Sequence, residues 1–451
     1  MDNGRDTRTL DLPVSFVPAP TDAFRRHRKM LQTLVQPGRP KAATATPTVP
    51  VRGCRALIWK QDPSVGEIGV RKVFLPGAVL AGPRDGRIVS GAPGLPAVTP
   101  NAFGDFIQTP NTDAFDAVHT YGVVRETLTM YQRALASGGS PAPLPWQWNS
   151  ATNIDPLSVF PHGLPDVINA FYSRSQKALR FGDFVPAGTT ARVFTCRSLD
   201  IVSHETGHAV LDGLKPTWIQ LGQPPQTGGL HESFGDLTAI FLTLSQLDQV
   251  EAIIAQTKAN LHDKTFLADM AEQFGLALGR PNGLRNADNN LKLSEVGTEV
   301  HAISQVFTGA IYDVVADIFA FERKTAVKDD AVTLYEVGRY LCGLVLRAII
   351  ASPGSGATFA AVANAMLQIA AADGKPVEYR NSIRSQFTLR EVVVSPTPIA
   401  EPQAHAAATR SESAGTPQDR SSCCGTMNSL EYLGVEQEIA AELEALRKAL
   451  K

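Results

Sequence analysis

The sequence predicts an α+β fold in which strands are concentrated towards the N-terminus and helices towards the C-terminus. Across residues 51–110, short β-branched runs such as the one in "CRALIWK" alternate with Pro and Gly, which is typical of strands joined by turns. Across residues 230–244, apolar residues recur every three or four positions, which indicates a helix with one buried face. With 451 residues, the chain is long enough for two or three domains.

The N-terminal half divides into three predicted parts. Residues 1–50 are rich in Pro, Thr and charge, and this composition predicts a disordered segment. Residues 51–110 form the β-rich N-terminal region. Residues 111–214 are expected to form an α/β lobe that begins with a helix over 112–135, continues with strands over 153–200 and ends in a second helix.

The C-terminal half is predicted to be helical over residues 215–395 and to continue as a linker over 396–428, where Pro, Ser and Thr are frequent. Residues 429–451 form a predicted amphipathic helix, with acids early and Lys and Arg late, as the helix dipole favours. Two docking surfaces remain open for this helix: the preceding domain or a partner protein.

Global composition excludes several functional classes. A net charge of −2 argues against binding to nucleic acid or to an anionic membrane. The five cysteines show no metal-binding spacing, and their odd number fits a reducing compartment. The N-terminus lacks a classical signal peptide, and the longest apolar run, "LCGLVLRAIIA", is shorter than the ~20 residues of a transmembrane helix. We therefore expect a cytoplasmic protein, or one exported by a non-classical route.

The segment "SLDIVSHETGHAVLDGL", residues 198–214, carries the strongest chemical signal in the chain. Its His204 and His208 are one helical turn apart, so both imidazoles point towards one place. Neutral imidazole is a good zinc ligand, and Glu205 beside the first histidine is positioned to act as a general base. This is the H-E-x-x-H pattern, which needs a third protein ligand to make a catalytic zinc site.

The third ligand is expected on a following helix. The extended pattern with a third histidine requires Gly at 211 and His at 214, but both positions hold Leu, so that class is excluded. The segment "GGLHESFGDLTAIFLTL" offers Glu232, with Asp236 one turn further along the same face. Asp236 is suited to accept the second N–H of a metal-bound histidine.

The combined H-E-x-x-H and E-x-x-x-D pattern resembles the thermolysin-like zinc peptidases, or gluzincins. The resemblance covers roughly residues 110–395 and rests on five motifs in family order. These are "NAFYSRSQKALRFGDF", "LDIVSHETGHAVLD", "LRNADN", "EVHAISQVFTGAIYDVV" and the closing helices that begin at "LYEVGRYLCGLVLR". It implies a two-lobed fold, with a β-rich N-terminal lobe, a mostly helical C-terminal lobe and the active-site helix between them.

The resemblance also implies roles for individual residues. One Zn²⁺ per chain would be held by His204, His208 and Glu232. Glu205 would be the general base and His301 would stabilise the oxyanion. The implied activity is that of a zinc metalloendopeptidase, whose partner is a peptide or protein substrate.

Three further residues match substrate-binding positions of the family. Asn169 and Ala170 lie in the segment that resembles its substrate-binding edge strand. Arg285, in "LRNADN", matches an arginine that holds a substrate carbonyl and the region of the third ligand together.

Several positions depart from the family pattern. The family's second oxyanion donor is a tyrosine, but no tyrosine occurs between residues 173 and 311, and Trp218 is the nearest side chain with a donor N–H. His231 stands before Glu232, where the family usually has Asn. The acid that orients His301 is either Glu295 or Glu299, and the sequence does not choose between them.

Calcium is not expected as a second cofactor. Asp200 matches one calcium ligand of the family, but Thr243 stands where the partner carboxylate should be, among apolar neighbours. Calcium takes 6 to 8 oxygen ligands and needs carboxylates to compete with water. Asp200 is instead expected to cap the helix that carries His204.

Two other functions stay open beside the peptidase. One is a non-catalytic module that keeps the fold and binds a partner, which the missing tyrosine favours. The other is a peptidase toxin or effector that is delivered into another cell.

Overall fold

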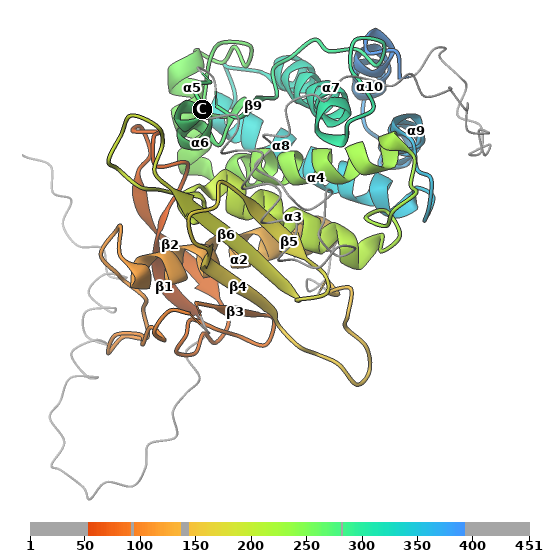
Figure 1. The fold of residues 1–451 in the computed structure, drawn as a ribbon. Coiled ribbons are helices and arrows are strands. Elements are labelled where there is room, and N and C mark those ends of the chain that lie inside the picture. The colour runs from red at the N-terminus through yellow and green to blue at the C-terminus, as the bar shows by residue number, and fades with distance from the viewer. Residues whose placement is uncertain (1–52, 92–93, 137–143, 281–282, 393–451) are drawn as a thin grey trace, which may run out of the picture. The chain divides into compact units, whose positions relative to one another are not determined.

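The structure, a computed structural model, describes residues 53–91, 94–136, 144–280 and 283–392. These residues form a mixed α+β fold, as the sequence predicts. Every described strand longer than two residues ends at or before Phe184, and helices predominate from Leu199 onwards (Figure 1). The N-terminal segment, the linker and the C-terminal helix that were predicted for 1–50, 396–428 and 429–451 lie outside the described residues.

The first two strands, β1 (Gly53–Trp59) and β2 (Val70–Pro76), pair antiparallel. Side chains of β1 alternate between buried and more exposed positions, so Cys54, Ala56 and Ile58 face the core. This buried face packs against the long helix α2 (Asp113–Leu135). The strands expected in this region therefore cover one side of α2.

A larger sheet contains the other main strands. Its order is β3 (Ile88–Ser90), β4 (Leu157–Leu164), β6 (Ala178–Phe184) and β5 (Ala170–Ser173), with β7 (Val193–Phe194) pairing with β6. The strands β3, β4 and β6 run parallel to one another, whereas β5 and β7 run antiparallel to β6. Strand β5 ends the path and packs against helix α3 (Leu199–Leu214), the helix that carries His204 and His208.

Helix α2 connects this sheet region with the helical part of the chain. The Thr112 hydroxyl accepts a hydrogen bond from the Phe115 backbone N–H at 3.2 Å and so caps the helix. Along its length α2 contacts β1, α3 and a later helix, α8 (Asp330–Ala351). The helix predicted over 112–135 is confirmed.

The rest of the described chain is mainly helical. Its elements are η1 (Thr195–Arg197), α3 (Leu199–Leu214), α4 (Pro225–Leu244), α5 (Leu247–Thr257), β8 (Asp269–Met270), α6 (Glu272–Ala277), β9 (Arg285–Asn286), α7 (Val300–Glu322), α8 (Asp330–Ala351), α9 (Phe359–Ala372) and α10 (Val377–Leu389). Helix α4 packs against α3 on one side and α7 on another (Figure 1). Every α4 residue from Thr227 to Leu244 is buried, so α4 is the core helix of this part.

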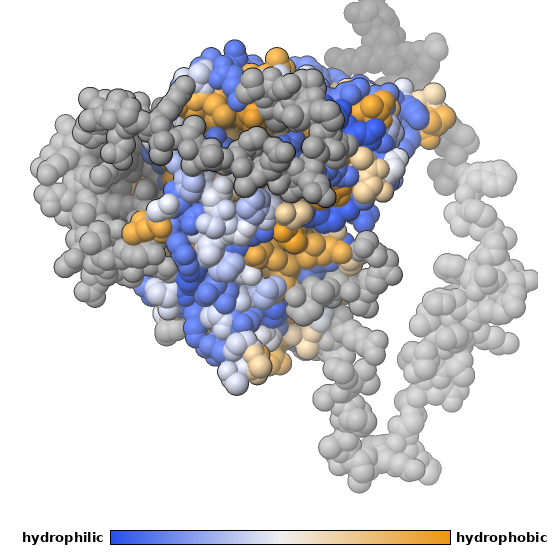
Figure 2. Space-filling model, turned by 90° about the vertical axis from the view of Figure 1, so that its right-hand side faces the viewer, coloured by the Kyte–Doolittle hydropathy of each residue, from blue (hydrophilic) through white to orange (hydrophobic). Residues whose placement is uncertain are grey.

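Among the described residues, α7 is long and apolar enough to cross a membrane by length and composition, but 83% of its most apolar window is buried inside the protein. That burial is what the packing of α7 against α4, α8 and α10 requires. A second candidate, α4 followed by α5, is bent by 91°. One face of the surface shows hydrophobic areas separated by hydrophilic residues (Figure 2).

The cysteines that the structure describes, Cys54, Cys196 and Cys342, are buried free thiols. Burial raises the pKa of the Cys342 thiol to about 12, which keeps it protonated and unreactive. Cys423 and Cys424 lie outside the described residues.

Candidate metal centre

Helices α3 and α4 bring two histidines and a glutamate together at one buried point. His204 Nε2 lies 3.5 Å from Glu232 Oε2, and His208 Nε2 lies 3.6 Å from Glu232 Oε1. Ligand atoms of all three residues lie within 4.8 Å of one another. Because His204 and His208 are one turn apart on α3 and Glu232 faces them from α4, three potential metal ligands converge from two rigid elements.

The two helices approach closely because each has a glycine at the crossing. A Cβ added to Gly207 would lie 2.5 Å from Thr238 Oγ1 and 3.1 Å from the Gly235 Cα. A Cβ added to Gly235 would lie 2.6 Å from Cε1 of the His204 ring. The glycine inside the H-E-x-x-H helix is therefore explained by close backbone packing, and Gly235 leaves the space that the His204 ring occupies.

Asp236 contacts the rear of the first histidine. Its Oδ1 lies 3.0 Å from His204 Nδ1 and accepts a hydrogen bond from Arg285 Nη2 at 2.8 Å. Burial opposes protonation of His204, but hydrogen bonds to Asp236 and Glu232 raise its pKa to about 9. The structure therefore places Asp236 where the sequence expected an outer partner. It places Arg285 against that same carboxylate, with Nη2 3.5 Å from His204 Nδ1.

His301 faces the same point from the start of α7. Its Nε2 lies 3.4 Å from Glu232 Oε2, and its Nδ1 lies 2.5 Å from Glu299 Oε1. Glu299 is the N-cap of α7 and accepts hydrogen bonds from the backbone N–H groups of His301 and Ala302. Glu295 instead accepts from the Lys292 backbone N–H at 3.0 Å. The choice left open by the sequence therefore falls on Glu299.

The charges around Glu232 are unusually concentrated for a buried site. Its ion-pair partners are the imidazoles of His204, His208 and His301. Burial alone would favour the neutral acid, but the positive charge of His301 and the hydrogen bond to His204 hold the pKa of Glu232 well below its usual range. Burial holds the pKa of His208 well below its usual range, so this ring is neutral and has a lone pair to offer.

Glu205 is 1% exposed and lies on α3 next to the first histidine. A cavity of about 20 Å³ borders Glu205, His204 and Arg285 and is lined elsewhere mainly by apolar side chains. This volume is sufficient for one water molecule. The carboxylate expected to act as general base therefore lies at the wall of a small cavity beside the metal ligands.

Asn169 and Ala170 lie at the start of β5, the strand that packs against α3. The Asn169 side-chain oxygen accepts a hydrogen bond from the Ala170 backbone N–H at 2.8 Å, and the Asn169 backbone carbonyl accepts from Gly182 at 2.9 Å. Both residues are buried. The structure thus places this predicted substrate-binding pair at the start of a strand that packs against α3, with the Asn169 side-chain oxygen and backbone carbonyl already hydrogen-bonded within the protein.

The structure answers two questions about neighbouring residues, and the expectation that Asp200 caps α3 is wrong. Trp218 is fully buried, and its indole N–H donates to the Pro353 carbonyl at 3.0 Å, so it does not replace the missing tyrosine. Asp200 does not cap α3, because the N-cap is Ser198 and the Asp200 carboxylate accepts from the Ala271 backbone N–H at 3.1 Å. In both cases a segment distant in sequence supplies the hydrogen-bond partner.

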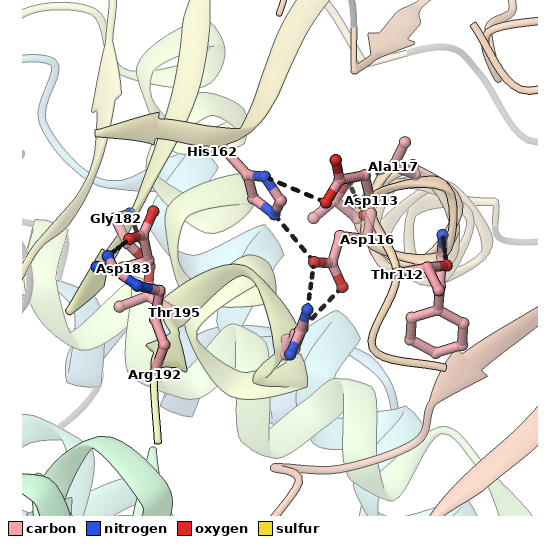
Figure 3. Close-up of polar contacts among 12 residues, drawn as sticks. Thr112, Asp113, Asp116, Ala117, His162, Gly182, Asp183, Arg192 and Thr195 are labelled. Carbon is pink, nitrogen blue, oxygen red and sulfur yellow. Dashed lines mark hydrogen bonds and ion pairs between the residues drawn. The ribbon is translucent and has the colours of Figure 1, made fainter. Parts of the chain in front are cut away.

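In the part of the chain that the structure describes, two further groups of possible metal ligands lie outside this centre. The first contains Asp116, His162 and Cys196. Figure 3 shows that His162 contacts both Asp113 and Asp116. Arg197 donates to both carboxylate oxygens of Asp116 at 2.9 Å. Since the arginine occupies this carboxylate, the group is an ion-pair cluster that fixes the chain just before α3 begins.

The second group contains His262, Asp288 and Asp313. His262 Nδ1 lies 2.9 Å from Asp288 Oδ1, and Arg390 Nη2 lies 2.9 Å from Asp313 Oδ2. An arginine again compensates one of the carboxylates. Of these three groups, only that of His204, His208 and Glu232 combines two imidazoles with a carboxylate.

Sequence reasoning missed one contact in the site. His208 Nδ1 lies 2.6 Å from His231 Nδ1. The available signal was the position of His231 next to Glu232, but a helical repeat does not indicate that neighbouring residues on α4 both face α3.

Comparison of the chain with models of known families and with curated proteins found no match. The function must therefore be argued from the residues and their geometry.

Proposed function

We propose that this protein is a zinc-dependent peptidase with the two-lobed, thermolysin-like architecture that its motifs resemble. The observation that carries the proposal is the convergence of His204, His208 and Glu232, with Glu205 beside them on α3. Two imidazoles and one carboxylate are the ligand set of many catalytic zinc sites, which keep a fourth position open. His301 on α7 adds a donor on the side of Glu232.

The donor set fits zinc better than a harder cation. Calcium and magnesium prefer oxygen ligands, whereas zinc readily combines imidazole nitrogen with carboxylate oxygen. The ring of His208 is neutral, and Asp236 fixes the orientation of His204 from behind. His204, His208 and Glu232 would therefore hold the ion.

When bound, zinc would polarise a peptide carbonyl and make a water molecule more acidic. Glu205 would accept a proton from that water as its oxygen bonds to the carbonyl carbon. His301, oriented by Glu299, would donate a hydrogen bond to the oxyanion. Glu205 would then pass its proton to the nitrogen of the leaving amine as the C–N bond breaks.

Substrate would be positioned by Asn169, Ala170 and Arg285, as the resemblance implies. The site is buried, with Glu205 1% and His301 6% exposed. Peptide binding would have to compete with the hydrogen bonds that Asn169 and Arg285 make within the protein.

The test separates the metal site from the reaction. Protein purified without chelators should contain one zinc per chain by elemental analysis. Glu205→Gln should retain the zinc, because Glu205 is not a ligand. It should cleave a mixed peptide library about 10²- to 10⁴-fold more slowly, as read by mass spectrometry. The exposed Glu378, on α10, offers a matched control, and Glu378→Gln should change neither property.

A zinc-free protein that added zinc does not restore would contradict the ligand assignment. Zinc binding without any cleavage by the wild-type protein would instead favour a binding module. One observation favours this second function. The Trp218 N–H donates to the Pro353 carbonyl, so it does not supply the second oxyanion donor that the family's tyrosine provides.

A further inference from the structure

His231 is a buried histidine that contacts one of the proposed metal ligands. It directly precedes Glu232 on α4 and is fully buried. Its Nδ1 lies 2.6 Å from the Nδ1 of His208, and the two rings are nearly parallel, with centroids 4.8 Å apart. Two lone pairs or two N–H groups cannot face each other at this distance, so one ring donates a hydrogen bond to the other.

The position of His208 decides which ring donates. Its Nε2 faces Glu232 and is the nitrogen that would carry the metal. A neutral imidazole that binds a metal through Nε2 keeps its proton on Nδ1. His208 Nδ1–H therefore donates, His231 Nδ1 accepts, and the proton of His231 lies on its Nε2, which has no hydrogen-bond partner among the described residues.

We propose that His231 is a positioning residue that fixes the tautomer and ring orientation of His208. The inference rests on the proposed zinc site. A metal-bound histidine normally donates its second N–H to an outer partner, and loss of that partner weakens metal binding. Asp236 has this place behind His204. The two metal-binding histidines thus have different outer partners, a carboxylate for one and a neutral imidazole for the other.

The nearby carboxylate of Asp212 is not available for this task. Asp212 lies one turn beyond His208 on α3, but its oxygens accept hydrogen bonds from Tyr172, at 2.7 Å, and from Arg174. Arg174 also donates to the Pro216 carbonyl, at 2.5 Å, so the carboxylate is held in a separate network. His231 therefore supplies the acceptor that His208 requires.

The first experiment measures zinc affinity in the full chain by competition with a chromophoric chelator. His231→Phe keeps a ring but removes the acceptor, and should weaken zinc binding about 10- to 100-fold. His231→Asn restores an acceptor oxygen and should bind zinc within a few-fold of the wild-type protein. His119→Phe is the matched control, because His119 is also a fully buried histidine but stacks on Phe115 in α2. It should leave zinc affinity unchanged.

Wild-type affinity in His231→Phe, or an affinity in His231→Asn as weak as in His231→Phe, would overturn the proposal. A second measurement does not depend on whether a variant folds. In ¹⁵N-labelled, metal-free wild-type protein, NMR should show scalar coupling between the two Nδ1 nuclei, and the zinc-bound protein should show a proton on His231 Nε2. Absence of that coupling, or a proton on His231 Nδ1 in the zinc-bound protein, would also overturn it.

These outcomes are distinct from failure of the proposed peptidase. A protein that binds zinc with this dependence on His231 but cleaves no peptide would refute the enzyme and support the positioning role. If the wild-type protein binds no zinc, the proposed function fails, and the NMR measurement decides the His208 to His231 contact by itself.

Discussion

His301 contacts two acidic residues that have different tasks. Its Nδ1 lies 2.5 Å from Glu299, whereas its Nε2 faces Glu232 at 3.4 Å. Burial opposes a charged His301, but the charge of Glu232 and the hydrogen bond to Glu299 raise its pKa. The ring is therefore held as a donor towards the metal centre.

If His301 stabilises an oxyanion, its removal should slow the chemical step. We expect His301→Ala to lower kcat and kcat/KM together, by an amount that corresponds to roughly 2.7 to 4 kcal/mol, with zinc content unchanged. Glu299→Gln should lower both in the same direction. Glu295→Gln is the matched control and should leave both unchanged, because Glu295 bonds to the Lys292 backbone. A pure rise in KM would assign His301 to substrate binding.

Glu126 on α2 is a partly buried acid outside the metal centre. Its Oε2 has no hydrogen-bond partner among the described residues. Burial raises the pKa of Glu126 from 4.5 to about 7. Between these two values the folded protein binds more protons than the unfolded chain, so its free energy of unfolding falls as the pH rises.

We expect Glu126→Gln to flatten this pH dependence between about pH 4.5 and 7. At pH 7 and above, the variant should be more stable by up to about 3 kcal/mol, since each pKa unit corresponds to about 1.4 kcal/mol. Urea unfolding at a series of pH values measures the effect. The exposed Glu251 is the control site, and Glu251→Gln should keep the slope of the wild-type protein. An equal slope in both variants would contradict the assignment.

Among the structural elements, the crossing of α3 and α4 determines whether the metal ligands meet. The two helices touch through Gly207 and Gly235, and the hydroxyl of Thr238 lies at the same crossing. Tyr131 of α2 contacts the Thr238 hydroxyl at 2.7 Å, so a third helix fixes the crossing. The ligand geometry is thus a property of helix packing as much as of the ligands themselves.

The two glycines should respond differently to a methyl group. Gly235→Ala would place a Cβ 2.6 Å from the His204 ring, and should weaken zinc binding by displacing that ring. Gly207→Ala would press on Thr238 and should lower the free energy of unfolding by roughly 1 to 3 kcal/mol. Gly66→Ala is the control, because nothing lies within 4 Å of its added Cβ. Zinc titration and urea unfolding test each variant, and equal behaviour of all three would refute the packing argument.

Across the whole molecule, Gln61 links the N-terminal strands to the helical part. Its side-chain Nε2 lies 3.1 Å from Thr243 Oγ1 on α4 and 3.5 Å from Gln249 Oε1 on α5. Asp200 lies in the same region. Burial and the charge of Asp62 raise the pKa of Asp200 to about 8, so this carboxyl is largely protonated at neutral pH.

We therefore expect the melting temperature to be nearly independent of calcium. The Gln61 amide lies between Thr243 and Gln249. Calcium would have to displace this amide and also the proton of the Asp200 carboxyl. Melting curves with millimolar calcium, and after calcium removal on a chelating resin at constant free zinc, test this expectation. A shift of many degrees would show that calcium binds, here or at another site, and would contradict the expectation.

Local spacing by itself determined the positions of His204, Glu205 and His208, because the helical repeat places residues one turn apart on one face. It also indicated the order of strands and helices, because the spacing of apolar residues along a short segment differs between a strand and a helix. The pairing of Glu232 and Asp236 on α4 has the same origin.

Only the tertiary structure decided which distant side chains meet. Glu299 and not Glu295 contacts His301 because α7 begins at Val300 and makes Glu299 its N-cap. Trp218 bonds to Pro353, and Asp200 bonds to Ala271, because chain segments remote in sequence pack against α3 and its C-terminal end. Such contacts depend on how whole elements pack, and a pattern of neighbouring residues in the sequence does not indicate this packing. For this reason the contact between His208 and His231 could not be predicted from the sequence.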